Sequence, residues 1–223
     1  LKCIVCLLSY MTTLQMASAQ DVIDVHAHII PQTYLSELER HNALMAEGFP
    51  LPKWTIENQL KWMDDAGVRT SVLSLAAPQP YFGDAKESAI IVRQLNEERA
   101  RAKAEHHGRF LWCATLPLPD VEAAIQEAEY ALDSLHADGI KLATNVLGQY
   151  LGSPELDTLL EVLNGRHAAI LLHPHKPEPV NAQVMHQTPL AMQEYLSETT
   201  RSVCNQKRLI SIILPQLISC VTN

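Results

Sequence analysis

The stretch Val22-Ile23-Asp24-Val25-His26-Ala27-His28-Ile29 decides which fold the rest of the chain has to fit. Apolar and polar residues alternate along it, which is the two-residue period of a β-strand with one buried face. Because side chains two positions apart on a strand point to the same face, His26 and His28 project together. Two imidazoles on one face are able to hold a divalent metal ion. The stretch therefore predicts a strand that carries a candidate metal site.

Strand-like and helix-like segments alternate along the rest of the chain. After the first strand at 22–28, apolar strand candidates are found at 69–77, 110–118, 139–146, 168–175 and 211–214. Helix candidates lie between them at 54–66, 86–107, 120–135, 153–164 and 189–204. Thr55 or one of its neighbours, Asp120 and Ser153 are the candidate caps, and Gly67 and Gly165 lie just past two helix ends. Strict alternation of this kind predicts βα units around a parallel sheet.

Two folds satisfy this alternation, an open doubly wound sheet and a (β/α)₈ barrel. No Gly-rich phosphate loop follows the first strand, which disfavours a nucleotide-binding doubly wound sheet. The longer inserts follow strands, at 29–53 and 78–85, and barrels build their active sites from the loops at the carboxyl ends of strands. We therefore expect the α/β class and a TIM-type (β/α)₈ barrel, truncated to about six βα units.

Composition excludes several classes of protein. The 223 residues are 47% hydrophobic and 19% charged, which is ordinary for a globular domain. With 17 Lys and Arg against 25 Asp and Glu, the net charge of −8 disfavours nucleic acid or an anionic membrane as the partner. Only 8 glycines and 5% aromatic residues disfavour a β-propeller or a lectin-like sandwich. Of the five cysteines, Cys3 and Cys6 would leave with an N-terminal signal segment, and Cys113, Cys204 and Cys220 are far apart and odd in number, so neither a disulfide framework nor a metal cage is predicted. We expect a small-molecule substrate.

Residues 1–19 have the layout of a secretory signal peptide. Lys2 precedes an apolar run at 4–11, and Ala17-Ser18-Ala19 is a small-x-small cleavage pattern. The alternative is a first strand or an N-terminal extension. If the segment is a signal, the protein is exported to the periplasm or secreted, with no membrane attachment after cleavage; otherwise it is cytoplasmic. The domain would then cover 20–205, with an aberrant or remnant tail at 206–223.

A second histidine pair occurs at the end of the fifth strand candidate. His173-Pro174-His175 follows an apolar run at 168–172, just as His26 and His28 occupy the end of the first strand. In a barrel of parallel strands, all carboxyl ends lie at one rim. We therefore expect the two histidine pairs to face the same space.

Short motifs occur in a fixed order between Asp21 and Asn205. They are Asp24-Val25-His26-Ala27-His28-Ile29-Ile30-Pro31, Met63-Asp64-Asp65-Ala66-Gly67-Val68, Arg109-Phe110 leading to Thr115-Leu116-Pro117, Asp138-Gly139-Ile140-Lys141-Leu142, Leu172-His173-Pro174-His175 and Glu198-Thr199-Thr200-Arg201. The ordered set resembles the amidohydrolase superfamily, in the branch of aminocarboxymuconate-semialdehyde, γ-resorcylate and methylsalicylate decarboxylases. An ordered set is far more specific than any single member of it.

The resemblance implies a metal-dependent barrel that usually holds zinc. By position, His26 and His28 would be the ligands from the first strand and His173 the ligand from the fifth. His175 would lie beside the metal or face the substrate, because the family places its ligand first in this motif. The alternative for each of them is a structural histidine.

Three further positions have two interpretations each. Asp24 would orient a ligand histidine, or it would be a carboxylate bound to backbone amides. Lys141 stands on the strand that supplies a bridging lysine in other branches, but it lies early in that strand and the decarboxylase-like branch is mononuclear, so bridging is the less favoured role. Tyr81 and Phe82 would line a pocket for a planar substrate or simply pack their loop.

The resemblance also implies a histidine on the sixth strand and an aspartate on the eighth. The family reads Leu-Pro-His where this chain has Leu214-Pro215-Gln216, and the amide of Gln216 cannot exchange protons near neutral pH. No counterpart of the eighth-strand aspartate is found in the sequence. The catalytic acid–base residue is therefore unassigned, and whether this chain is an active enzyme is left open.

Three hypotheses follow for the function. The first is a metal-dependent, non-oxidative decarboxylase (a carboxy-lyase) of a small aromatic or muconate-like acid. The second is a metal-dependent hydrolase of a lactone or an amide on the same scaffold. The third is an inactive metal-binding remnant. Family members often form dimers, so a homodimer is a further expectation.

Overall fold

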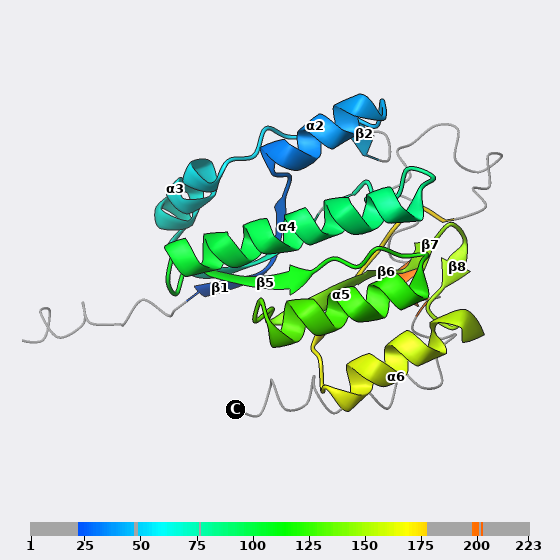
Figure 1. Ribbon diagram of the computed structural model, residues 1–223. Coiled ribbons are helices and arrows are strands. Elements are labelled where there is room, and N and C mark those ends of the chain that lie inside the picture. Colours follow the sequence, from blue (N-terminus) through cyan, green and yellow to red (C-terminus); the bar gives the residue numbers. More distant parts are fainter. Residues whose placement is uncertain (1–21, 47–48, 76, 178–197, 201, 203–223) are drawn as a thin grey trace, which may run out of the picture.

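Five parallel strands form the sheet of the computed structural model, which describes residues 22–46, 49–75, 77–177, 198–200 and 202. The strands pair in chain order as β1 (Val22–Ile29), β4 (Val68–Leu75), β5 (Phe110–Ala114), β6 (Gly139–Ala143) and β9 (Ile170–His173). Helices α3 (Ile56–Ala66), α4 (Ala85–Glu105), α5 (Val121–Asp133) and α6 (Asp157–Gly165) make the connections (Figure 1). The predicted βα alternation is therefore confirmed over its first five strands.

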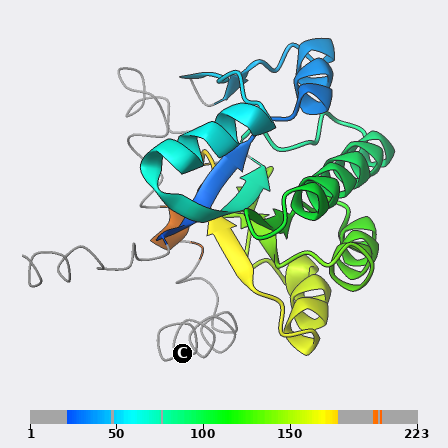
Figure 2. The same cartoon turned by 90° about the vertical axis from the view of Figure 1, so that its left-hand side faces the viewer.

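The sheet is curled into a half-barrel. β1 and β9 are its two outer strands, separated by four strand intervals. At the usual spacing of neighbouring strands, a flat sheet would place them about 19 Å apart. Instead, the Nε2 atoms of His28 on β1 and His173 on β9 lie 3.0 Å apart. Figure 2 shows the strands curving in this way, with helices α4, α5 and α6 on one side of the sheet.

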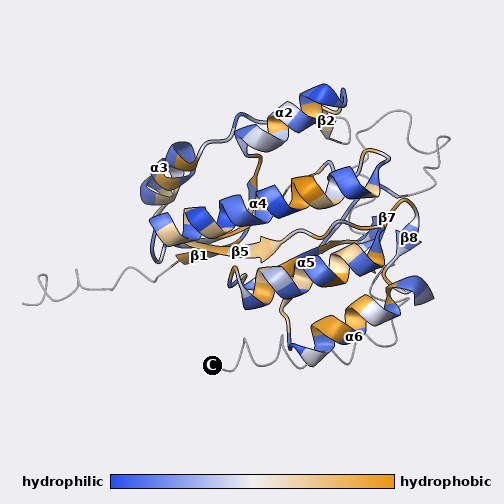
Figure 3. Ribbon diagram, in the orientation of Figure 1, coloured by the Kyte–Doolittle hydropathy of each residue, from blue (hydrophilic) through white to orange (hydrophobic). Residues whose placement is uncertain are grey.

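The main core lies between the sheet and its helices. Side chains of the strands, including Leu73 and the fully buried Trp112, pack against Met63 of α3 and Ala124 of α5. Figure 3 shows the hydrophobic strand β5 beside helices that mix hydrophilic and hydrophobic residues. Because the helices cover the outer side of the curled sheet, the polar residues of the strands are left to face the inner side.

The predicted helix caps at Thr55 and Asp120 are confirmed. Thr55 Oγ1 accepts a hydrogen bond from the backbone amide of Asn58 at 3.2 Å, and Asp120 accepts from Ala123 at 3.0 Å. Gly67 ends α3 with a φ of +69°, a conformation that glycine adopts without a steric penalty. Each of these positions was recognisable because its signal is local.

The predicted start and end of the helix at 153–164 are wrong by a few residues. Ser153 makes no side-chain cap, because a single 3₁₀ turn, Pro154–Leu156, runs directly into α6. The helix then includes Gly165 instead of ending before it.

The strands predicted at 69–77, 110–118, 139–146 and 168–175 all extend beyond the observed β4, β5, β6 and β9. β5 stops at Ala114 because both backbone groups of Thr115 bind the Asn96 side chain of α4, the amide at 3.0 Å and the carbonyl at 2.9 Å. β6 stops at Ala143, after which β7 (Asn145–Val146) and β8 (Gln149–Tyr150) form a hairpin. Leu147 and Gly148 form its turn, both with positive φ.

The insert at 29–53, expected as a loop, contains regular structure. It forms helix α2 (Gln32–Arg40) and the short strands β2 (Met45–Ala46) and β3 (Phe49–Pro50). Tyr34 and Leu38 of α2 pack against Ile91 and Leu95 of α4 in a second small core.

The proposed signal at 1–19, the strand at 211–214 and the tail at 206–223 lie outside the described residues. So does most of the helix at 189–204, of which residues 198–200 and 202 are helical. Within the part of the chain that the structure describes, no helix is long and apolar enough to span a membrane.

Candidate metal centre

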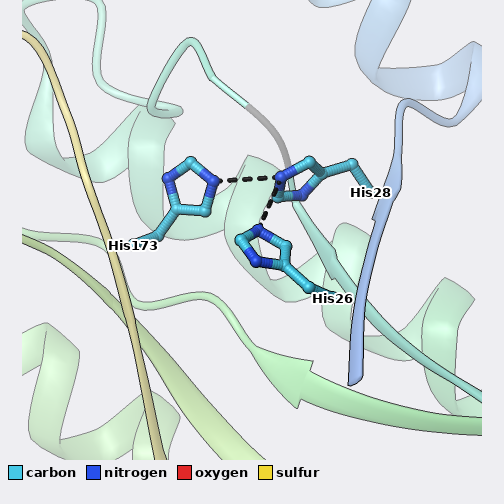
Figure 4. A group of neighbouring side chains, drawn as sticks. All are labelled: His26, His28 and His173. Atoms are coloured by element: carbon cyan, nitrogen blue, oxygen red, sulfur yellow. Dashed lines mark hydrogen bonds between the residues drawn. The ribbon is translucent and has the colours of Figure 1, made fainter. Parts of the chain in front are cut away.

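Three imidazoles gather at the open side of the half-barrel. His26 and His28 come from β1 and His173 from the carboxyl end of β9, and their ligand nitrogens all lie within 4.8 Å of one another. His28 Nε2 is 2.9 Å from His26 Nε2 and 3.0 Å from His173 Nε2 (Figure 4). The structure thus brings together the three histidines that the sequence singled out as ligands.

His26 lies within a β-bulge of β1. The pairing of β1 with β4 shifts register between Asp24 and Ala27, so β1 carries one extra residue there. The backbone amide of His26 donates to Asp24 Oδ1 at 3.0 Å. The observed partner of Asp24 is therefore this amide, within the bulge, and the half-buried carboxylate supports His26 through the backbone.

Hydrogen bonds at Nδ1 fix the tautomers of the other two histidines. His173 Nδ1 lies 2.7 Å from the carbonyl oxygen of Pro174, which only accepts, so Nδ1 carries the proton. His28 Nδ1 lies 3.1 Å from Ser74 Oγ, a buried hydroxyl whose own donor is directed at the Ala27 carbonyl at 3.5 Å. Both contacts leave the Nε2 lone pairs directed toward the shared space.

Burial and neighbouring charge keep these two imidazoles neutral. Burial, followed by the charges of His26 and Lys141, lowers the pKa of His28 to about 4. Burial, followed by the charges of Lys141 and His28, lowers the pKa of His173 to about 3. Neutral imidazole is the form that ligates a metal, so both side chains are ready to bind one at neutral pH.

The arrangement fits a divalent cation. Imidazole nitrogens about 2.0–2.1 Å from one ion, at tetrahedral or right angles to each other, are separated by roughly 2.9–3.4 Å. The two shortest Nε2 separations, 2.9 and 3.0 Å, fall in this range. Because His28 and His173 both carry their proton at Nδ1, their Nε2 lone pairs repel each other at 3.0 Å, and a shared cation removes that repulsion. Three imidazole nitrogen donors favour zinc or another first-row divalent metal.

The remaining predicted residues lie around this group in different ways. Lys141 is buried in β6, where its charge acts on both His28 and His173. His175 is half-buried, and its backbone amide donates to Thr144 Oγ1 at 3.0 Å. Gln216 lies outside the described residues.

Phe82 and Tyr81 lie in the loop between β4 and α4. The Phe82 ring stacks on His41 with ring centroids 4.1 Å apart, and it packs against the small core between α2 and α4. The backbone amide of Tyr81 donates to the Gln79 carbonyl at 2.9 Å, and its side chain is half-buried. For Phe82, the observed contacts are those of a residue that packs its loop.

Two contributors were missed from the sequence. Ser74 pairs directly with His28 across β1 and β4, and only knowledge of that register would have revealed it. Glu198 belongs to a recognised motif, yet it received no role; it is fully buried and accepts a hydrogen bond from the Tyr150 hydroxyl at 2.7 Å. Its signal was the single acidic residue of the motif Glu198-Thr199-Thr200-Arg201.

Residues 23–200 match the model of the Amidohydrolase family. The chain is 41% identical over 160 residues to the decarboxylase yanB of Aspergillus niger, covering 69% of this chain and 43% of that protein. It is 33% identical over 185 residues to the 6-methylsalicylic acid decarboxylase acuB of Aspergillus aculeatus, covering 81% and 55%. The chain thus spans about half the length of these relatives.

Solved structures agree with the fold. A crystal structure described as amidohydrolase II matches with a TM-score of 0.79 and 32% identity, over 82% of this chain and 60% of that one. A dihydroxybenzoic acid decarboxylase from Polaromonas sp. JS666, solved with bound manganese, matches with a TM-score of 0.60 and 21% identity, over 74% and 52%. The curled parallel sheet, the histidines at its rim and the family match over most of the sequence lead to one conclusion: the chain belongs to the amidohydrolase family.

Proposed function

We propose that this protein is a divalent-metal-dependent decarboxylase of a small aromatic acid, of the 2-hydroxybenzoate type. The observation that carries the proposal is the convergence of three imidazoles from β1 and β9 on one point. Relatives at 41% and 33% identity are named decarboxylases, one of them for 6-methylsalicylic acid. That name supplies the substrate class that we propose here.

The reaction in question is non-oxidative. The bond between the ring carbon and the carboxylate breaks, its electron pair stays on the ring carbon, and that carbon takes a proton as CO₂ leaves. A divalent cation, when bound, would supply the Lewis acidity that orients and polarises the acidic substrate. His26, His28 and His173 would hold it, with zinc as the first candidate and manganese as the second.

Lys141 favours the binding of an anionic substrate beside the three histidines. The buried charge of Lys141 acts on both His28 and His173, so it adds positive potential beside the three imidazoles. Because such a charge acts in a medium of low polarity, it attracts a carboxylate more strongly than a surface lysine does.

The test combines metal binding with product analysis. The protein is stripped with a chelator, titrated with Zn²⁺ or Mn²⁺ in a calorimeter, and assayed with 6-methylsalicylate for CO₂ and the corresponding phenol. We expect near-stoichiometric metal, reduced at least ~10-fold in affinity by His28→Ala or His173→Ala. His107→Ala, which changes an exposed histidine remote in sequence from the site, is the matched control.

Each outcome separates the hypotheses. Loss of metal binding and of CO₂ release in the two site variants, but not in the control, supports the proposal. Release of an acid from an aromatic lactone without CO₂ would replace the decarboxylase with a hydrolase. If the unmodified protein binds neither metal, both enzymatic functions are excluded.

A further inference from the structure

A buried polar cluster lies next to the metal centre and takes part in no step described so far. Its centre is the Thr144–Asn145 segment, which follows β6 and begins the β7–β8 hairpin. On one side it contacts the chain that follows β9, and on the other Glu198 and Ser202, which belong to the helical residues 198–200 and 202. In Figure 2 those helical residues, in orange, lie on the side of the sheet opposite α4–α6.

Three hydrogen bonds fix the segment His173–Lys176 on Thr144 and Asn145, and a fourth joins Thr144 to the helical residues. The Thr144 amide donates to the His173 carbonyl at 3.0 Å, and the His175 amide donates to Thr144 Oγ1 at 3.0 Å. Asn145 Nδ2 donates to the Lys176 carbonyl at 2.9 Å. Ser202 Oγ donates to the Thr144 carbonyl at 2.8 Å, which ties the segment to the helical residues. Contacts before and after Pro174 therefore constrain the carbonyl that fixes the His173 tautomer.

The Asn145 side chain can hold the Lys176 carbonyl in place only if the orientation of its own amide group is fixed. Asn145 is 1% exposed; its Oδ1 accepts from the Gly148 amide at 3.3 Å, and its Nδ2 faces Glu198 Oε2 at 3.5 Å in addition to the Lys176 carbonyl. An amide NH₂ has two donor hydrogens, and these two acceptors account for both.

Glu198 is the charged member of the cluster. Its side chain is fully buried, and Oε2 accepts from the Tyr150 hydroxyl at 2.7 Å as well as facing Asn145 Nδ2. The carboxylate therefore binds both ends of the β7–β8 hairpin, at Asn145 and at Tyr150. Removing a carboxylate from water is costly unless hydrogen bonds compensate for the lost hydration. Because Glu198 depends on its hydrogen bonds in this way, it holds Tyr150 and Asn145 in a defined geometry.

We infer that Glu198 is a positioning residue of the metal centre: through Asn145 it fixes the backbone at 174–176, and thereby the ring orientation and tautomer of His173. The inference rests on the proposed function, since it concerns the same three-histidine site. In this role Glu198 does not bind the metal itself, because its hydrogen bonds reach His173 only through Asn145 and the backbone.

The test compares two buried carboxylates in the full chain. Glu198→Ala removes the acceptor next to the site, and Glu127→Ala removes a buried carboxylate that binds Arg93 and Asn96 between α4 and α5. For each variant, calorimetry gives the dissociation constant for Zn²⁺ and urea unfolding gives the stability of the metal-free chain. We expect Glu198→Ala to weaken metal binding ~10-fold or more and Glu198→Gln to restore it to within ~3-fold. Glu127→Ala should lower stability without changing the dissociation constant.

A second readout does not depend on metal. Long-range ¹H–¹⁵N spectra report the protonated ring nitrogen of each histidine, and comparison with His173→Gln assigns the signal. His173 should be protonated at Nδ1 in the unmodified chain and a mixture of tautomers in Glu198→Ala. If that variant does not fold, Tyr150→Phe, which removes only one hydroxyl, should show both effects in weaker form.

The outcomes separate this inference from the proposed function. If the unmodified chain binds no metal, the proposed function fails, and the tautomer of His173 still decides the role of Glu198. If Glu198→Ala binds metal as tightly as Glu127→Ala does and leaves the His173 spectrum unchanged, Glu198 only stabilises the fold and the inference is overturned.

Discussion

Asp24 shows how one side chain influences the metal centre without touching an imidazole. Its carboxylate accepts the His26 amide within the bulge of β1. Asp24→Ala removes this acceptor, so the bulge loses its internal hydrogen bond. We expect the His26 side chain then to be held less firmly toward His28. We expect the affinity for Zn²⁺ to fall ~10-fold, as calorimetry would measure it.

The same position offers a conservative control. Asp24→Asn keeps an oxygen that accepts the His26 amide, so its affinity should stay within ~3-fold of the unmodified chain. Asp65→Ala, which changes an exposed carboxylate paired with Lys61 on α3, should have no effect. Equal loss in Asp24→Ala and Asp24→Asn would show that charge, and not the support of the bulge, is what Asp24 contributes.

Single residues of the site could be predicted to the extent that their signal is local. His26 and His28 follow from the period of one strand, and the pair His173 and His175 from the end of another, whereas the choice of His173 as the ligand rests on the resemblance to the family. Ser74 and the bulge depend on the register between β1 and β4, which no short stretch of sequence specifies. For the same reason the sequence left the partner of Asp24 open.

Helix α4 is fixed to the sheet by buried polar groups as well as by apolar packing. Asn96 is fully buried, and its amide binds both backbone groups of Thr115, Glu127 Oε1 at 2.7 Å and Arg99 Nη1 at 3.1 Å. Burial lowers the pKa of the Arg99 guanidinium to about 10, so it still carries its charge at neutral pH. Asn96 is therefore the neutral residue that joins the charged side chains of Arg99 and Glu127 by hydrogen bonds.

Asn96→Ala should destabilise the chain by about 3 kcal/mol, because it leaves the Thr115 amide, Glu127 and Arg99 with unsatisfied buried groups. Urea unfolding measures the loss. Gln94→Ala, on the exposed side of the same helix, should change stability by less than about 0.5 kcal/mol. If Asn96→Ala lowered stability by less than about 1 kcal/mol, water would have to replace the hydrogen bonds of the Asn96 amide.

The contact between β6 and β9 depends on a glycine. A Cβ atom at Gly139 would lie 2.8 Å from the Ala169 carbonyl oxygen, which is itself bound by the Ile140 amide at 2.8 Å. Gly139→Ala would force the strands apart where β9 begins, and β9 carries His173. We expect a stability loss of about 1–3 kcal/mol by urea unfolding, together with weaker metal binding.

Gly165 is the matched control for this substitution. A Cβ atom there meets nothing within 4 Å, and the residue lies at the last position of helix α6. Gly165→Ala should be neutral or slightly stabilising, since alanine restricts the unfolded chain. If Gly139→Ala lowered stability no more than Gly165→Ala, the Ala169 carbonyl would have to move away from the new Cβ atom without a measurable cost in stability.

Elements with a strong local signal were predicted well, and those fixed by long-range contacts were not. Capped helices α3 and α5 and the five strands were recognised from spacing and caps. Helix α2 was missed because its apolar positions, Tyr34 and Leu38, are few and become meaningful only against α4. The early end of β5 depends on Asn96, a side chain from another element.

At the scale of the whole molecule, the curvature of the sheet makes the site. Order and direction of the strands follow from the βα alternation, because right-handed crossovers place consecutive parallel strands side by side. Curvature does not follow from that alternation, since open sheets share it. It is shown by the meeting of His28 and His173, which come from the two outer strands.

The half-barrel also links the histidines to the stability of the whole chain. In the unfolded chain His28 and His173 would have a pKa near 6.5, against about 4 and about 3 in the folded chain. Between these values the unfolded state binds more protons than the folded state, so stability falls as pH decreases from about 6.5 toward 4. Above about 6.5 the two residues add no pH dependence. The urea midpoint of the metal-free chain should therefore drop between pH 7.5 and pH 5.

The double variant His28→Gln/His173→Gln isolates this effect, because glutamine does not titrate and keeps a polar side chain at each position. Its urea midpoint should change less between pH 7.5 and pH 5 than that of the unmodified chain, while His107→Gln should keep the original slope. Carboxylates titrate mainly below this window and cancel in the comparison. Equal slopes in all three proteins would mean that the two imidazoles take up protons in the folded chain as readily as in the unfolded one, and the half-barrel would not keep them neutral for a metal.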